Sequence, residues 1–136
     1  MIVEINSIPP QASVIKLLSY ATSVNKVDKV YRNYIQSSNQ QLFGLVKENN
    51  IVGCIGIELN AKICEIKHIA VAPEERSNGI GSRLIKFLFG KFSLTTIIAE
   101  TDKDAVEFYR NLGFKVTSLG EKYPMVERFL CEFKTN

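Results

Sequence analysis

The first half of the chain changes between strand-like and helix-like patterns of hydrophobic residues. Residues 2–6 alternate apolar and polar positions, as a short strand does. Apolar residues then recur at helical spacing in two segments: Val14, Leu17, Leu18 and Ala21, followed by Val30, Tyr31 and Tyr34. Two β-rich runs, 42–47 and 51–59, are joined by the turn-forming residues Glu48, Asn49 and Asn50. We therefore expect a strand, two helices and a β-hairpin, in that order.

The second half predicts further strands and helices in alternation. The expected strands span residues 62–72, 94–99, 115–118 and 128–133. Two sets of residues at helical spacing lie between them: Leu84, Ile85, Leu88 and Phe89, followed by Ala105, Phe108, Tyr109 and Leu112. Gly113 comes where a helix-ending residue in the left-handed conformation belongs. This order indicates an α/β (α+β) fold with a mixed sheet, in a single domain over residues 1–136.

One predicted strand departs from strict alternation. Its apolar residues are spaced three, three and two apart: Ile63, Ile66, Ile69 and Val71. An extra residue near Lys67 or His68, a β-bulge, would return them to one buried face. Such a bulge would bend the strand away from the neighbouring strand that begins at Leu94. We therefore expect a V-shaped gap between these two strands.

The same strand leads into a loop with two glycines and then into a helix start at Ser82. Gly79 and Gly81 have no Cβ, so backbone N–H groups there can approach a ligand closely. The first turn of the helix adds unpaired N–H donors and the positive end of the helix dipole. Arg76 adds a planar cation suited to phosphate. The run favours an anion-binding site, and a turn in which glycines relieve strain is the alternative.

Two motifs extend this picture: Arg76-x-x-Gly79-x-Gly81 after a strand, and the run Phe-Tyr-Arg-Asn-Leu-Gly-Phe at 108–114. Over residues 42–117 the chain resembles the GNAT superfamily of N-acetyltransferases. The resemblance implies a mixed, mostly antiparallel central sheet with a splayed strand pair, flanked by helices on both faces. It also implies acetyl-CoA as co-substrate, no metal, and direct acetyl transfer in a ternary complex to a primary amine of a small molecule or peptide.

The resemblance also assigns cofactor-binding residues. In the family, the strand before the loop pairs with the pantetheine arm and the loop binds the pyrophosphate. The implied residues are Ile69, Ala70 and Val71 for the arm, and Arg76, Ser77, Asn78, Gly79, Ile80, Gly81 and Ser82 for the pyrophosphate. Asn78 replaces a basic residue common in the family, so phosphate binding would depend on Arg76, the backbone and Arg83. Asp102 replaces a frequent asparagine beside the cofactor, and its carboxylate is equally suited to cap the following helix.

Tyr109 and Glu65 are the candidate catalytic residues. The phenol of Tyr109 is suited to protonate the coenzyme A thiolate or to donate a hydrogen bond to its sulfur. Glu65 has the same offset from the glycines as the catalytic glutamate of some GNAT enzymes and would accept the proton of the amine. His68, the one histidine of the chain, and a water molecule are the alternatives for the base. Backbone N–H groups near Ile69 would polarise the thioester carbonyl.

Composition and charge exclude several other classes of function. The net charge of +3 comes from scattered basic and acidic residues, so we expect no nucleic-acid partner. No apolar stretch approaches the roughly 18 residues of a membrane helix, and the N-terminus has no targeting pattern, so we expect no membrane partner. Cys54, Cys64 and Cys131 lie in apolar runs without a Cys-x-x-Cys pair, as buried free thiols of a cytoplasmic protein do.

The residues expected around the amine do not identify it. Segments 25–34 and 121–125 would contribute a partly aromatic wall formed by Tyr31, Tyr34, Tyr123 and Met125. Such a wall is compatible with polyamines, amino sugars, peptide termini and lysines. The apolar segment 129–133 is expected at a sheet edge, where it would favour a homodimer.

Two other functions compete with acetyl transfer. Gly79 and Gly81, with Glu100 further on, faintly resemble a dinucleotide-binding fingerprint, but Leu84 occupies the place of its third glycine. The other is a non-catalytic acyl-CoA-binding sensor or interaction module on the same fold. Only Tyr109 and Glu65 favour catalysis over that alternative.

Overall fold

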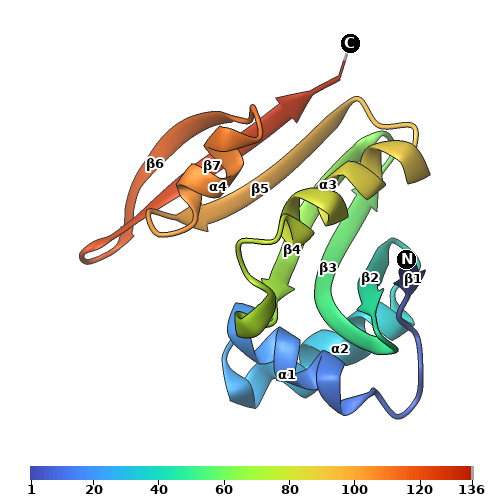
Figure 1. The fold of residues 1–136 in the computed structure, drawn as a ribbon. Helices are drawn as coiled ribbons and strands as arrows, with labels where there is room; N and C mark the ends of the chain where they lie inside the picture. Colours follow the sequence, from blue (N-terminus) through green and yellow to red (C-terminus); the bar gives the residue numbers. More distant parts are fainter. Residues whose placement is uncertain (136) are drawn as a thin grey trace.

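The structure, a computed structural model, describes residues 1–135 and contains a seven-stranded sheet with the order β1-β2-β3-β4-β5-β7-β6 (Figure 1). The strands are β1 (Ile2–Glu4), β2 (Gln40–Lys47), β3 (Asn50–Asn60), β4 (Ile63–Val71), β5 (Thr96–Asp102), β6 (Lys115–Tyr123) and β7 (Val126–Lys134). All neighbours are antiparallel except β4 and β5, which are parallel. The expected mixed, mostly antiparallel sheet is confirmed, and it differs from the doubly wound parallel sheet of dinucleotide-binding domains.

Helices cover both faces of the sheet, as expected. They are α1 (Ala12–Ala21), α2 (Val27–Gln36), α3 (Ile80–Lys91) and α4 (Val106–Asn111), with short 3-10 helices η1 (Val24–Lys26) and η2 (Pro73–Glu75). α1 and α2 share one buried cluster with Leu42 and Cys54, whereas α3 and α4 share another with Ile55 and Ile57. Within residues 1–135, no helix has both the length and the apolarity that crossing a membrane requires.

The turn between β2 and β3 consists of two residues, Glu48 at φ 51° and Asn49 at φ 66°. Two successive left-handed residues form the kind of turn whose twist matches a tight hairpin. Asn50 already belongs to β3 and pairs with Lys47. The expected hairpin is confirmed, with a shorter turn than the three residues the sequence indicates.

The expected bulge lies in β4. His68 is opposite Gly56, but Ile66 is opposite the residue that follows Gly56, so Lys67 is the extra residue. The pairing of β4 with β5 ends at the same place, with the pair Ile66–Ala99. Beyond it the two strands diverge, which confirms the splayed pair (Figure 1).

β5 is shifted relative to its expected range. It begins at Thr96 rather than Leu94 and continues through Thr101 to Asp102. The extension has a physical cause, because β7 pairs with β5 as far as the pair Asp102–Arg128. Pairing with a strand distant in sequence thus extends β5 through polar residues that its own hydrophobicity does not indicate.

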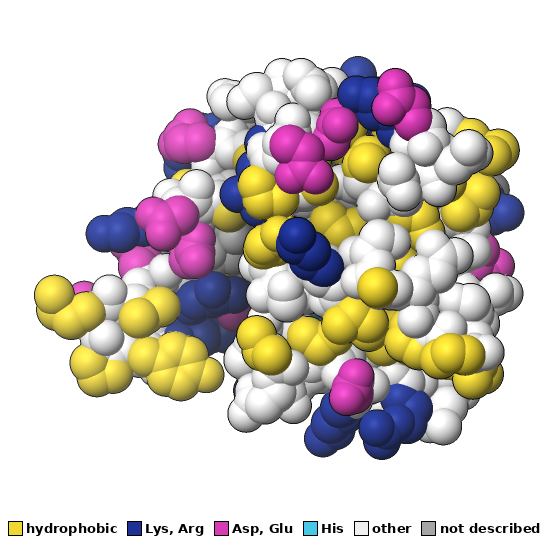
Figure 2. Space-filling model, turned by 60° about the horizontal axis from the view of Figure 1, so that its bottom comes forward, with side chains coloured by type: hydrophobic (Ala, Val, Ile, Leu, Met, Phe, Trp, Pro, Cys, Tyr) yellow, Lys and Arg dark blue, Asp and Glu magenta, His cyan; other side chains and the backbone are white. Residues whose placement is uncertain are grey.

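β6 and β7 form one hairpin, longer than the expected strands, with its turn at Pro124 and Met125. The expectation that residues 129–133 lie at a sheet edge is wrong. β7 has β5 on one side and β6 on the other, so its backbone groups are already paired and β6 is the edge strand. Apolar side chains are exposed at the tip of this hairpin, Tyr123 and Met125 among them (Figure 2).

α2 is fixed on the sheet by a close contact between Tyr34 and Gly56 of β3. A Cβ at Gly56 would lie 2.0 Å from the hydroxyl oxygen of Tyr34. Tyr34 is buried, so its ring has little freedom to move aside. Any residue with a Cβ at position 56 would therefore overlap the ring of Tyr34, and only glycine avoids this overlap.

We expect Gly56→Ala to lower the free energy of unfolding by about 1–3 kcal/mol, because the added methyl group must displace the buried ring of Tyr34. Gly90→Ala on α3 is the matched control, since nothing lies within 4 Å of a Cβ there. Alanine favours a helix over glycine by roughly 0.5–1 kcal/mol, so this control should be neutral or stabilising. Urea unfolding measures both changes, and a Gly56→Ala protein as stable as the wild type would contradict the contact.

Candidate functional site

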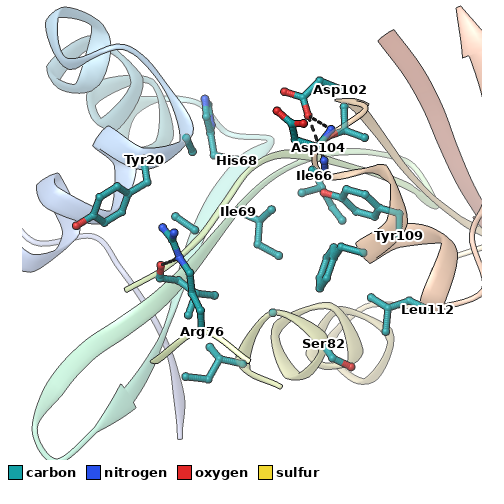
Figure 3. Close-up of a pocket in the computed structure, with 18 of the residues that line it drawn as sticks. Tyr20, Ile66, His68, Ile69, Arg76, Ser82, Asp102, Asp104, Tyr109 and Leu112 are labelled. Atoms are coloured by element: carbon teal, nitrogen blue, oxygen red, sulfur yellow. Dashed lines mark hydrogen bonds between the residues drawn. The ribbon is translucent and has the colours of Figure 1, made fainter. Parts of the chain in front are cut away.

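A cavity of about 850 Å³ opens where β4 and β5 separate (Figure 3). Its walls come from β4, the loop after it, the first turn of α3, the end of β5, and α4. The expected site residues that line it are Ile69, Ala70, Val71, Arg76, Ser77, Gly79, Ile80, Gly81, Ser82, Asp102 and Tyr109. Asn78 and Glu65 do not line it. The structure thus brings most of the expected site residues to one cavity.

Arg76 is fixed in the cavity by two contacts. Its Nε donates a hydrogen bond to the backbone oxygen of Val71 at 3.1 Å. Its guanidinium carbon lies 5.3 Å from the centre of the Tyr20 ring on α1, a cation–π contact. Neither contact uses the two terminal nitrogens of the guanidinium. They are available to an anion, and the fixed side chain loses little conformational entropy on binding one.

The glycine loop adds backbone donors beside Arg76. Gly79 has φ 76°, and no atom lies within 4 Å of the place of a Cβ, so the left-handed backbone is what favours glycine. α3 begins directly after it, and Arg83 N–H donates a hydrogen bond to the Gly79 carbonyl at 3.0 Å. The N–H groups of the first three residues of α3 therefore precede the intrahelical bonds. Together with Arg76 they form the arrangement of an anion site.

Gly81 also serves the packing of the site. A Cβ at Gly81 would lie 3.0 Å from the ring of Phe108 on α4. Phe108 in turn meets Tyr109 edge to face, with ring centres 5.1 Å apart. The missing side chain therefore lets α4 approach α3 closely and fixes the helix that carries Tyr109.

Glu75 connects the loop to the β2–β3 hairpin. Its Oε1 accepts hydrogen bonds from Lys47 Nζ at 2.8 Å and from Asn78 Nδ2 at 3.4 Å. The hydrogen bond from Lys47 lowers the pKa of the Glu75 carboxyl. Asn78 thus supports the loop, and its contact with a cofactor stays a prediction.

Tyr109 is 4% exposed and packs edge-on against Phe108 and Phe114. Burial raises the pKa of its phenol, so the hydroxyl keeps its proton at neutral and mildly alkaline pH. Among residues 1–135 the structure gives this hydroxyl no hydrogen-bond partner. In Figure 3 the ring extends from α4 towards Ile66, where β4 leaves β5. A protonated hydroxyl with a free hydrogen is suited to donate to a bound molecule.

Both ends of α4 are fixed. At the start, Asp102 Oδ1 accepts hydrogen bonds from the backbone N–H of Asp104 at 3.0 Å and of Ala105 at 3.1 Å. At the end, Gly113 has φ 93°, and the residue after it donates a hydrogen bond to the Tyr109 carbonyl. The carboxylate of Asp102 therefore caps the turn that leads into α4, while the N-cap residue of α4 itself is Ala105, and Asp102 also lines the cavity.

Glu65 lies on β4 before the bulge. It is opposite Glu58 on β3 and Ile98 on β5. Its side chain is 36% exposed, and Lys67 Nζ lies 3.9 Å from its Oε2. Since two carboxylates directly opposite each other repel, the ammonium group of Lys67 offsets an unfavourable pair. A role of Glu65 as base requires a water molecule between it and the cavity.

His68 follows the bulge and lines the cavity. Its Nδ1 is hydrogen-bonded to the hydroxyl of Tyr34 at 2.5 Å, and the two rings meet edge to face. Burial, and to a lesser degree the charge of Lys67, lowers the pKa of His68. The imidazole is therefore neutral at neutral pH.

The sequence did not indicate every residue of the cavity. Tyr20 comes from α1 and Arg128 from β7, and no local pattern connects either to the glycine loop. Conversely, none of the residues of the expected aromatic wall lines the cavity: Tyr31, Tyr34, Tyr123 and Met125. The first two are buried side chains of α2, and the last two are exposed at the hairpin tip.

Comparison with known proteins gives two findings from sequence. A family model described as an acetyltransferase (GNAT) domain matches residues 11–123. An uncharacterized N-acetyltransferase from Bacillus methanolicus is 35% identical over 66 residues, which are 48% of this chain and 55% of that protein. The match thus spans about half of that relative's length.

Solved structures of GNAT proteins share the fold over nearly the whole chain. An aminoglycoside 6'-N-acetyltransferase in complex with coenzyme A superposes with a TM-score of 0.84 at 18% identity, covering 98% of this chain and 96% of that one. The Escherichia coli ribosomal-protein-S18-alanine N-acetyltransferase gives 0.82 at 17% identity, with 98% and 92% covered. A GNAT acetyltransferase from Elizabethkingia anophelis with bound acetyl-CoA gives 0.78 at 20% identity, with 99% and 97% covered.

We expect Asp102→Ala to lower the free energy of unfolding by about 1 kcal/mol, because two backbone N–H groups before α4 lose their acceptor. Asp102→Asn keeps an acceptor oxygen and should cost much less. Asp104→Ala, which removes the neighbouring carboxylate but no such hydrogen bond, is the control. Chemical unfolding compares the three variants, and equal losses in all of them would attribute the stabilisation to negative charge rather than to capping.

Proposed function

Because the chain belongs to the GNAT family of acetyltransferases, we propose that it moves the acetyl group of acetyl-CoA directly to a primary amine. The observation that carries the proposal is the cavity between the separated strands, with Arg76 and the glycine loop in one part and Tyr109 in another (Figure 3). Acetyl-CoA has the matching chemistry, since it combines a pyrophosphate, an amide-containing arm and a thioester in one extended molecule.

The residues present fit this co-substrate. β4 has no β5 neighbour beyond Ile66, so residues 69–71 can pair with the amides of the arm as with another strand. Arg76 and the first N–H groups of α3 fit the pyrophosphate. When bound, acetyl-CoA supplies an acetyl group activated as a thioester.

In the proposed reaction the chain positions the reactants and moves protons. Tyr109, kept protonated because burial raises its phenol pKa, donates to the departing sulfur. Backbone N–H groups near Ile69 polarise the thioester carbonyl. Glu65 accepts the proton of the amine through a water molecule, because its carboxylate does not line the cavity.

The acceptor is a primary amine of a small molecule or of a peptide. The structural relatives named above include an aminoglycoside acetyltransferase and an enzyme that acts on an alanine of a ribosomal protein, so one fold accommodates both classes. Acidic and basic side chains of β5, of the turn before α4 and of β7 line the cavity as well: Glu100, Asp102, Asp104 and Arg128. These charges give a polar acceptor partners at the cavity wall.

We expect acetyl-CoA to raise the unfolding temperature, and Arg76→Gln to reduce that shift. Ligand at about 100 times its Kd adds about 2.7 kcal/mol of stability, which corresponds to several degrees in a domain of this size. Removing a charged phosphate partner should weaken binding about tenfold. Arg83→Gln is the matched control, because Arg83 lies on α3 but does not line the cavity.

Differential scanning fluorimetry with acetyl-CoA, coenzyme A and NAD measures these shifts. A shift with NAD alone would contradict the proposed co-substrate. An equal loss of the acetyl-CoA shift in Arg76→Gln and Arg83→Gln would contradict the assignment of pyrophosphate binding to Arg76 rather than Arg83, the residue that the sequence also offered.

We expect Tyr109→Phe to lower kcat about 100-fold and to leave acetyl-CoA binding intact, because only the hydroxyl of a buried ring is removed. The assay measures release of the coenzyme A thiol, with an aminoglycoside, a peptide with N-terminal alanine and a diamine as acceptor substrates. Wild-type turnover should persist into alkaline pH, since burial raises the pKa of Tyr109 and preserves its acid form. Unchanged kcat in Tyr109→Phe would refute the acid role, and acetyl-CoA binding without turnover would favour a non-catalytic sensor.

A further inference from the structure

Tyr34 and His68 form a part-buried pair beside the cavity. The hydroxyl oxygen of Tyr34 and His68 Nδ1 are 2.5 Å apart, and the ring centres are 5.7 Å apart in an edge-to-face arrangement. The contact with Gly56 fixes the tyrosine ring in this place. We propose that Tyr34 is a positioning residue that fixes His68 as the Nε2–H tautomer, so that His68 offers the cavity a hydrogen-bond donor and not a proton acceptor.

The direction of the hydrogen bond follows from the partners available. Among residues 1–135 the Tyr34 hydroxyl has no other hydrogen-bond partner, so its hydrogen is directed to His68 Nδ1. In the reverse arrangement, with Nδ1–H donating to the oxygen, the phenol hydrogen would be without an acceptor in a buried place, which costs free energy. An Nδ1 that accepts a hydrogen bond requires the ring proton on Nε2.

The surroundings keep both partners neutral. Burial raises the pKa of Tyr34, and Cys54 and Glu58 on β3 and Glu65 on β4 act in the same direction. Burial also lowers the pKa of His68, and Lys67 on β4 adds to this effect. A phenolate with an imidazolium is thus disfavoured at both rings, and the neutral pair with tyrosine as donor persists at neutral pH.

The position of His68 determines which group its Nε2–H can contact. His68 directly follows the bulge and lines the cavity, and Nδ1 is already occupied by Tyr34. In the proposed function, on which this step rests, backbone N–H groups near Ile69 contact the thioester carbonyl. Nε2–H is then left as a donor for the amine substrate, and it favours a substrate that carries an acceptor oxygen near its reacting nitrogen. A peptide N-terminus or an amino sugar has such an oxygen, and an alkyl polyamine does not.

Nitrogen NMR of the imidazole tests the tautomer. The chain has one histidine, so labelling with ¹⁵N-histidine gives a single imidazole whose long-range ¹H–¹⁵N spectrum identifies the protonated nitrogen. We expect the wild type to carry the proton on Nε2. Tyr34→Phe keeps the ring but removes the donor, so the tautomer ratio should shift about tenfold towards Nδ1–H, and the pKa of His68 should rise.

Tyr31→Phe is the matched control. Tyr31 lies on the same helix and is also buried, but its hydroxyl donates to the Ser7 backbone oxygen at 2.7 Å. Its removal should leave the His68 signals unchanged. An Nδ1–H tautomer or an equal mixture in the wild type overturns the proposal, and that spectrum requires neither a variant nor a ligand. A Tyr34→Phe spectrum identical to the wild type also overturns it.

A comparison of amines tests the consequence for the substrate. With acetyl-CoA, kcat/KM for a peptide with N-terminal alanine should exceed that for an alkyl diamine about tenfold or more. His68→Ala should abolish this preference, and His68→Gln, which keeps an N–H donor but cannot act as a base, should restore most of it. A diamine that reacts as well as the peptide overturns the oxygen-bearing acceptor. The tautomer spectrum and the thermal shift with acetyl-CoA are measured separately, so failure here is distinguishable from failure of the proposed function.

Discussion

One extra residue in β4 determines where the sheet closes and where it opens. Up to the pair Ile66–Ala99, β4 and β5 share parallel hydrogen bonds, and from Lys67 onwards β4 changes register against β3 and leaves β5. The crossover between two parallel strands must pass over one face of the sheet, and here α3 forms it. α3 therefore begins beside the widening gap. The cavity and the unpaired side of β4 depend on this irregularity, and the free N–H groups at the start of α3 lie beside the gap.

Close contacts between aromatic rings and glycine backbone fix two helices on the sheet and beside the gap. Tyr34 of α2 lies over Gly56, and Phe108 of α4 lies against Gly81. Each contact places a phenol on a rigid element, Tyr34 itself in the first case and Tyr109 beside Phe108 in the second. The hydroxyl groups of Tyr34 and Tyr109 are therefore positioned by helices that pack closely against glycine backbone, and not by loops.

Features set by neighbouring residues could be predicted from the sequence, and features set by distant ones could not. The bulge is visible in the spacing of apolar residues, and the loop before α3 in Arg76 and Gly79, because each depends on a few consecutive positions. The contact of Tyr20 with Arg76 and the central place of β7 arise only when distant segments pack. Glu65 shows the limit most clearly, since the sequence predicts the bulge after it but not which side chains of β4 reach the cavity.

Burial divides the site into a neutral interior and a charged rim. Among the residues the structure describes, no charged side chain is buried, and the groups within the walls, Tyr109 and the Tyr34–His68 pair, have pKa values shifted towards their neutral forms. The carboxylates that line the cavity, Glu100, Asp102 and Asp104, are not buried, so charge on the cavity wall stays in contact with solvent. A buried phenol, by contrast, keeps its proton and is suited to donate a hydrogen bond to sulfur as negative charge develops there. Burial thus keeps the phenol of Tyr109 a hydrogen-bond donor and makes the imidazole of His68 a poor base, which is why the proposed function assigns the base to a carboxylate.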